Sequence, residues 1–277
     1  MHRHTCGFLS QLNAESQEYG NKIAPFTDFI SARAKTILQL VGEQNIVDGE
    51  IVFRALIESF IKLSYVVLPG DKESVGERLN EFYNVILEIE DFRDSIRSRG
   101  MLKQETSVSI RTFLLGSILP KEKEEEVRIK YNFVNDNKSP VYQALDTNWG
   151  FGKLVIRFGD NKIYNGPVVH TLVDMRKAWV TASSFSHAGP GAIRFMNQRN
   201  ARPEMERSNS NLMHVHKLMY SATTYHIWSA LILAQFLNRP DVEQSILNTY
   251  SPIRQNLIRL KDIIQKEALS APRYKDA

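Results

Sequence analysis

The chain has 277 residues, of which 43% are hydrophobic and 24% charged, a composition typical of a globular protein with a sizeable core. Its single cysteine, Cys6, excludes an internal disulfide framework, so we expect a reducing, cytoplasmic environment. The polar N-terminal segment is unlike a signal peptide, and the most apolar run, 227–237, is too short to cross a bilayer, so we expect a soluble protein and no membrane partner. The net charge of +4 is compatible with an anionic partner without identifying one.

The first half of the chain is predicted to be helical. Apolar spacing and stop signals predict helices over 12–40, 49–67, 73–98, 105–117 and 120–133. Pro25 is expected to kink or divide the first of these helices, and Asp48 is expected to cap the second. Gly100 is expected to stop the third.

The second half contains an interruption. Residues 135–166 are predicted to form an irregular insert, with a small β-hairpin over "KLVIRFGDNKIYNG", because strand-like residues flank "GDN". Helices are then expected over 167–187 and 209–237, joined by a loop rich in arginine, and two shorter helices over 240–269. Residues 270–277 are expected to fray. With no repeat and no linker, the prediction is one mostly α domain over 1–277 with a small β insert.

Four polar residues fall on the apolar side of the predicted helix 167–187. At about 100° per residue, Leu172 and Trp179 lie on an apolar stripe, but Arg176, Ser183 and His187 fall within or beside it. Ser186 joins them. Unpaired polar groups are costly to bury, so these residues should have partners on another helix. Arg176 lies about 16 Å from His187 along the helix, so it needs a partner of its own.

The predicted helix 49–67 offers such partners on a narrow polar edge that includes Arg54, Glu58 and Lys62. A carboxylate often fixes an imidazole tautomer or binds a guanidinium, so Glu58 could orient His187 or pair with Arg176. Two other interpretations stay open. Glu58 could form a local pair with Lys62 at a solvent edge, and the polar residues together could form a purely structural network.

Common enzyme signatures are absent from the sequence. It contains no HExxH, no paired CxxC, no phosphate-binding glycine loop and no GxSxG, so no metal or cofactor is expected. His226 lies on an apolar stripe of the long C-terminal helix, where a histidine satisfied within the core is the simpler interpretation. A Ser/His hydrolase built on Ser183 and His187 is disfavoured because no oxyanion donors are apparent.

Two segments resemble a known group of proteins. "RALIESFIKLSYVV" resembles the Arg-x-x-x-Glu helix, and "WVTASSFSHAG" the Ser-x-x-x-His helix end, of a bacterial family of helical domains related to HEPN proteins. The tryptophan of "TNWG" also fits, and the resemblance spans about 53–187. It implies a HEPN-like helical bundle, often dimeric, and the activity of a metal-independent ribonuclease in toxin or phage-defence systems.

The resemblance also suggests further site residues. Its motif, an arginine followed by histidine after four to six residues, occurs at Arg207 and His214. Either His214 or His187 would act in proton transfer, with an arginine stabilising the phosphorane. Phosphate contacts would come from the preceding loop through Arg194, Arg199 and Arg202, although the same charges could merely keep that loop soluble.

Two hypotheses follow for function. In the first, the chain is a cytoplasmic, RNA-cleaving or RNA-binding effector that uses Arg54, Glu58, Arg176, Ser183 and His187. In the second, it is a non-enzymatic helical partner or regulator of another protein, and the same residues fix core geometry or dimer register.

Overall fold

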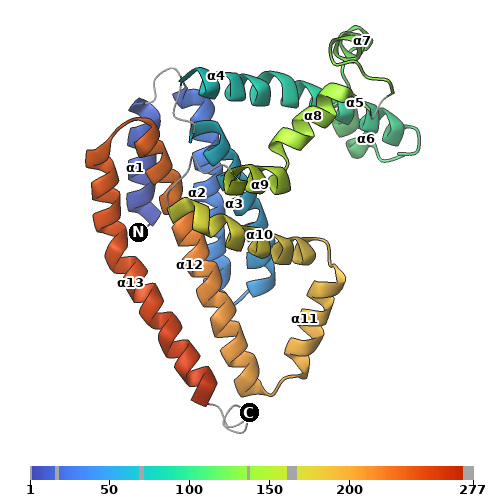
Figure 1. Cartoon of the computed structure of the whole chain (residues 1–277). Helices are drawn as coiled ribbons and strands as arrows, with labels where there is room; N and C mark the ends of the chain where they lie inside the picture. Colours follow the sequence, from blue (N-terminus) through green and yellow to red (C-terminus); the bar gives the residue numbers. More distant parts are fainter. Residues whose placement is uncertain (1, 16–18, 69–71, 136–137, 161–166, 271–277) are drawn as a thin grey trace. The chain divides into compact units, whose positions relative to one another are not determined.

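The computed structural model describes residues 2–15, 19–68, 72–135, 138–160 and 167–270. These residues are mostly helical, as expected, and contain no β-strand (Figure 1). None of the described helices combines the length and the apolar content needed to span a membrane. The chain divides into two compact units, one formed by 1–70 and 155–277 and the other by 71–154. The expectation of a single domain over the whole chain stays a prediction.

The first unit contains most of the long helices. They are α1 (His2–Glu15), α2 (Gly20–Gly42), α3 (Ile46–Val67), α10 (Pro167–Ser186), α11 (Pro190–Ala201), α12 (Glu204–Phe236) and α13 (Pro240–Ser270). The second unit contains α4 (Lys72–Asn80), a π-helical segment (Glu81–Ile86), α5 (Leu87–Leu102), α6 (Val108–Gly116), α7 (Lys121–Lys130) and α8 (Pro140–Trp149). Helix α9 (Phe151–Asp160) spans the boundary between the units.

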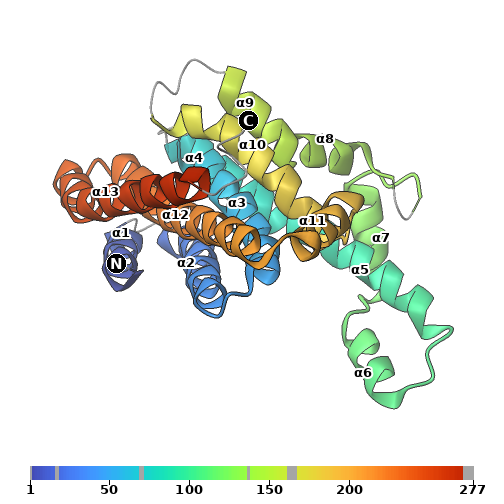
Figure 2. The ribbon, with the colours of Figure 1, turned by 90° about the horizontal axis from the view of Figure 1, so that it is seen from below.

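Helix α3 lies at the centre of the first unit, where it packs against α2, α10 and α12 (Figure 2). The predicted apolar stripe is buried, including Phe53, Ile57 and Phe60. The approach of α3 to α12 is close, because a Cβ atom added to Gly49 would lie 3.0 Å from Leu218 Cδ1. A large side chain at position 49 would therefore push the two helices apart.

The predicted β-hairpin is wrong over the part that the structure describes. Residues 153–160 belong to α9, and the rest of the hairpin, 161–166, lies outside the described residues. The buried positions of α9 are Phe151, Leu154, Val155 and Phe158. Their spacing of i, i+3, i+4 and i+7 is that of one helix face, and this period outweighs the β propensity of valine and isoleucine. Helix α8 likewise occupies part of the predicted irregular insert.

Several predicted boundaries also shift. The predicted loop after His187 is helix α11 followed by the first turn of α12. Pro190 stands in the first turn of α11, where its missing N–H costs nothing. Residues 240–269 form part of one helix, α13, and not two, while α5 continues past Gly100. Asn45, not Asp48, caps α3, because its side chain accepts a hydrogen bond from the Asp48 N–H.

Candidate functional site

A tight turn between α10 and α11 brings His187 to the surface. Ala188 adopts a left-handed backbone with φ of 47°, which ends α10, and α11 begins two residues later. The Ser184 hydroxyl accepts a hydrogen bond of 3.0 Å from the Ala192 N–H, so it fastens the start of α11 to the end of α10. A Cβ atom at Gly191 would lie only 2.8 Å from the same hydroxyl, which explains a glycine there. His187 is exposed beside this turn.

Arg54 of α3 connects to that turn through its guanidinium group. Its Nη1 donates a hydrogen bond of 2.8 Å to the Ser186 hydroxyl and lies 2.7 Å from His187 Nε2. Its Nε donates a bond of 2.9 Å to Glu58 Oε1, one helical turn further along α3. Residues 133 positions apart in the sequence thus meet in one polar cluster.

Trp179 completes this cluster from α10. Its indole N–H donates a hydrogen bond of 2.7 Å to Glu58 Oε1, the oxygen that also binds Arg54. The Arg54 guanidinium carbon lies 5.3 Å from the centre of the indole ring, within cation–π range. Glu58 therefore fixes both the arginine and the tryptophan, and we refer to Arg54, Glu58, Trp179, Ser186 and His187 as the Arg54 cluster.

The Arg54 cluster is open to solvent. The side chains of Arg54 and Glu58 are 25% and 31% exposed, and His187 is exposed. A guanidinium group only donates hydrogen bonds, so His187 Nε2 must accept and its proton must lie on Nδ1. The contacts above use Arg54 Nε and Nη1, and Nη2 takes part in none of them. An incoming anion would meet a guanidinium group already held in position.

The structure brings some of the predicted residues together and separates others. Arg54, Glu58 and His187 meet, and Arg54 contacts both Glu58 and His187. Ser183 contributes its carbonyl oxygen, which accepts a bond of 2.9 Å from the Ser186 hydroxyl. Arg176 is exposed on α10 and is not among the residues that join Arg54 and Glu58.

The predicted site residues did not include Trp179 or Ser186, although the sequence placed Ser186 beside the apolar stripe. Trp179 was assigned to the apolar stripe, yet it is only half-buried and its N–H turns to Glu58. Its distance of seven residues from Ser186 places both on one helix face, and this spacing was the available signal.

Both residues of the predicted Arg207–His214 motif lie on α12, and His214 contacts a residue of α3. His214 Nδ1 is 3.4 Å from Oε1 of Glu50, a carboxylate with no exposed side-chain surface. Lys217 Nζ donates a bond of 2.8 Å to the same oxygen. Burial raises the pKa of Glu50, but the hydrogen bond with His214 and the charge of Lys217 outweigh it, so this pKa falls below its usual value. Sequence reasoning missed Glu50, although it lies on the apolar stripe of α3.

The predicted RNA-binding arginines lie on or just beyond α11, which contains no acidic residue. Arg194 and Arg202 are exposed, whereas Arg199 is half-buried and its Nε has no hydrogen-bond partner among the described residues. The structure thus replaces the predicted loop with a basic helix that follows His187 directly. His226 is buried and its Nε2 lies 3.0 Å from the Ser31 hydroxyl, which confirms the prediction of a satisfied core histidine.

These features define the chain as an all-α protein with a partly exposed Arg–Glu–Trp–Ser–His cluster where α3 meets the end of α10. Searched against known protein families, curated proteins and solved structures, the chain shows no significant match. Within the part of the chain that the structure describes, no three His, Cys, Asp or Glu residues are grouped to hold a metal ion.

Proposed function

We propose that the chain is a HEPN-like, RNA-cleaving effector of the cytoplasm that acts without a metal ion, with Arg54 and His187 as its catalytic residues. The observation that carries this proposal is the contact of 2.7 Å between Arg54 Nη1 and His187 Nε2 on an exposed surface. An arginine and a neutral imidazole in contact are the two groups needed to bind a phosphodiester and to move its proton.

The proposed reaction follows from the donors and acceptors of the cluster. A phosphate oxygen replaces His187 as an acceptor of the Arg54 guanidinium, and this frees His187 Nε2 to take the proton of the RNA 2′-hydroxyl. The 2′-oxygen then bonds to phosphorus and the bond to the 5′-oxygen breaks, that oxygen taking a proton from the imidazolium or from water. Arg54 stabilises the charge that develops on the phosphorane oxygens. The products carry a 2′,3′-cyclic phosphate and a 5′-hydroxyl.

Two other residues have positioning roles in this proposal. Glu58 binds Arg54 Nε and so fixes the plane of the guanidinium, while Trp179 fixes Glu58. The exposed Arg194 and Arg202, which follow His187 in the chain, supply contacts to neighbouring phosphates. The half-buried Arg199 is a weaker candidate for that contact.

A second candidate function is that of a non-enzymatic interaction protein. It is favoured by the hydrogen bond between Trp179 and Glu58, which joins α10 to α3. This bond would stabilise the fold even if the protein catalysed no reaction. In that case the Arg54 cluster fixes the position of α10, and its removal lowers the stability of the protein without affecting any reaction.

The first test is cleavage of a single-stranded RNA by the purified chain in the presence of EDTA. We expect products with 2′,3′-cyclic phosphate ends, and we expect His187→Ala to slow cleavage by at least about 100-fold. Arg54→Lys keeps the charge but loses the fork geometry, so a loss of at least about tenfold is expected. Lys177→Gln is the matched control, because it removes an exposed charge of α10 outside the cluster and should leave the rate unchanged.

The same preparations separate the two candidate functions. Thermal unfolding should show wild-type stability for His187→Ala, since the side chain is exposed. Equal cleavage rates for wild type and His187→Ala would exclude the Arg54 cluster as the active centre. Absence of cleavage for every RNA tried, together with a clear loss of stability in Arg54→Gln, would favour the structural role.

A further inference from the structure

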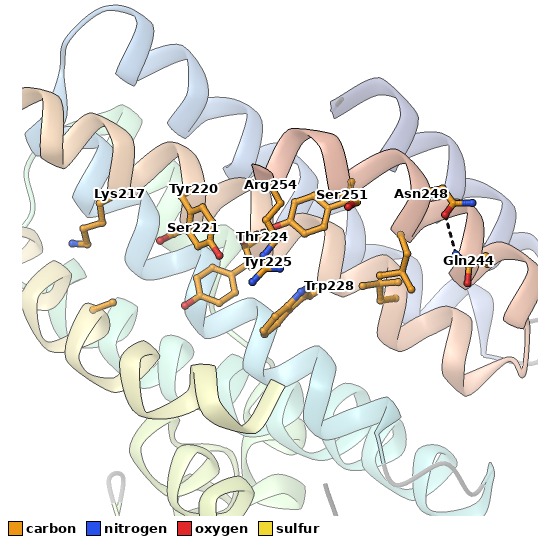
Figure 3. A pocket seen from close by; sticks show the side chains of 14 residues that line it. Lys217, Tyr220, Ser221, Thr224, Tyr225, Trp228, Gln244, Asn248, Ser251 and Arg254 are labelled. Atoms are coloured by element: carbon orange, nitrogen blue, oxygen red, sulfur yellow. Dashed lines mark hydrogen bonds between the residues drawn. The ribbon is translucent and has the colours of Figure 1, made fainter. Parts of the chain in front are cut away.

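A cavity of about 900 Å³ lies between α12 and α13 in the first unit (Figure 3). None of its lining residues belongs to the Arg54 cluster, so it is a separate feature of the molecule. Its volume lies within the range of sites that hold small organic molecules. Neither α12 nor α13 contributes to the proposed reaction, so that proposal leaves this cavity unexplained.

One wall of the cavity is formed by aromatic side chains that pack against the core. Tyr225 and Trp228 line it from α12. Tyr225 packs against Phe60 with ring centres 5.2 Å apart, and the Trp228 ring lies 6.4 Å from that of Phe60. Since Phe60 is fully buried in α3, both rings are backed by the core. A flat ligand ring can pack on these two side chains without the entropy cost of ordering them on binding.

The spacing of the two helices at the cavity is fixed by a buried hydrogen bond. The hydroxyl oxygens of Thr224 in α12 and Tyr250 in α13 lie 3.0 Å apart. Burial raises the pKa of the Tyr250 hydroxyl, so it stays protonated and keeps this bond at physiological pH. The cavity is therefore built into the helix pair.

One end of the cavity is positively charged. Figure 3 shows Lys217 and Tyr220 toward this end, Arg254 near the middle beside Thr224 and Tyr225, and Gln244 and Asn248 toward the other end. Lys217 is already bound to the buried Glu50, whereas Arg254 lies close enough to Tyr220 for this neighbour to raise the pKa of its guanidinium group. The described residues that line the cavity include no Asp or Glu. Arg254 is thus an exposed cation in a lining without carboxylates, so it can bind an anionic group.

The opposite end is polar and uncharged. Gln244 and Asn248 carry amide groups that bond to each other at 2.9 Å. Amides offer both donors and acceptors, so they can bind the polar edge of a ring but do not attract a second charge. The amide pair thus lies at one end of the cavity, whereas Arg254 lies beside the aromatic wall.

From this arrangement we propose that the cavity binds an aromatic anion, a molecule with a flat ring that packs on Trp228 and Tyr225 and a single phosphate or carboxylate that binds Arg254. The Tyr220 hydroxyl then donates to the same anion after losing its contact with Arg254. The site stands independently of the proposed RNA cleavage, because it uses other residues.

The test is binding of two probes, adenosine 5′-monophosphate and indole-3-acetate, by isothermal titration calorimetry at low salt. At least one probe should bind, while inorganic phosphate and uncharged adenosine should bind at least about tenfold more weakly. Arg254→Gln should weaken binding of the active probe by at least about tenfold. The Arg259→Gln variant is the matched control, since Arg259 is an exposed residue of the same helix outside the cavity lining. This variant should bind the probe as the wild type does.

A second variant tests the aromatic wall. Trp228→Leu should weaken binding of the same probe, while thermal unfolding verifies that the variant is folded. Binding of the nucleotide alone would assign the anion as a phosphate, and binding of the indole alone would assign it as a carboxylate; either result supports the proposal. No binding of either probe, or equal binding by wild type and Arg254→Gln, overturns it.

Discussion

Glu50 shows how a single residue can join helices at an energetic cost. It is fully buried on α3, and its Oε1 contacts both His214 and Lys217 of α12. Its Oε2 has no hydrogen-bond partner among the described residues, so the desolvation of this oxygen is uncompensated there. The net lowering of its pKa nevertheless means that the contacts favour the ionised form in the folded state.

The first prediction concerns the stability contributed by Glu50. We expect Glu50→Gln to lower the free energy of unfolding at neutral pH by about 1–3 kcal/mol, because Lys217 then lacks its anionic partner. The folded-state pKa of Glu50 lies below its usual value, so its ionised form stabilises the fold above that usual value. This contribution is lost as the pH falls through the folded-state pKa.

Urea unfolding of both proteins between neutral pH and about pH 3 measures this effect. The difference between wild type and variant should be largest near neutral pH and shrink in acid. Glu43→Gln changes an exposed carboxylate just before α3 and should have little effect. A difference that does not depend on pH would contradict the role of the Glu50 charge.

Among the helices, α10 depends on α3 for its position. The Trp179 N–H bonds to Glu58, and Arg54 reaches past it to Ser186 and His187 at the end of α10. These contacts act at both the middle and the end of the helix, so they fix its rotation as well as its position. This rotation decides whether His187 meets Arg54.

The prediction for this helix pair is that Trp179→Phe lowers the free energy of unfolding by about 1 kcal/mol, since it removes one hydrogen bond at a partly exposed carboxylate but keeps a large ring. If the proposed function holds, it should also reduce RNA cleavage, because Glu58 and Arg54 lose a fixed neighbour. Chemical denaturation and the cleavage assay measure the two effects. Val180→Ala, at an exposed position of α10, serves as the control, and equal stability of both variants would argue against the link.

For the molecule as a whole, the first unit is discontinuous in sequence. Its core is formed by α2, α3 and α12, which come from the first and last parts of the chain, and the second unit occupies the residues between. The Arg54 cluster and the cavity between α12 and α13 both lie within the first unit. Each of them therefore draws its residues from a single compact body.

The corresponding prediction is that the first unit folds by itself. A chain in which residues 71–149 are replaced by a flexible Gly/Ser linker of about ten residues should keep a helical circular dichroism spectrum and unfold in one cooperative transition. It should also bind the aromatic anion as the full chain does, since it retains α9 and every residue that lines the cavity. A broad, non-cooperative transition would show that the first unit needs the second to fold.

Residues close in sequence explain the predictions that held. The buried face of α3 and the stop after α10 follow from apolar spacing and from a glycine–proline turn, which act over one or two helical turns. The same local logic failed for α9, where the β-branched residues favoured a strand although the buried positions follow a helical period. It also failed at α11, since an arginine-rich segment without a clear apolar face resembles a loop.

The sequence by itself determined that the protein is helical and that polar groups on the helices at 46–67 and 167–186 need partners, because burial of an unpaired polar group is costly in any fold. Only the tertiary structure decided the pairing. It placed Arg54 and not Glu58 against His187, turned Trp179 toward Glu58, and left Arg176 exposed. The physical reason is that contacts across 133 residues depend on how each helix is rotated and shifted along its neighbour, and the packing of whole helix faces sets both.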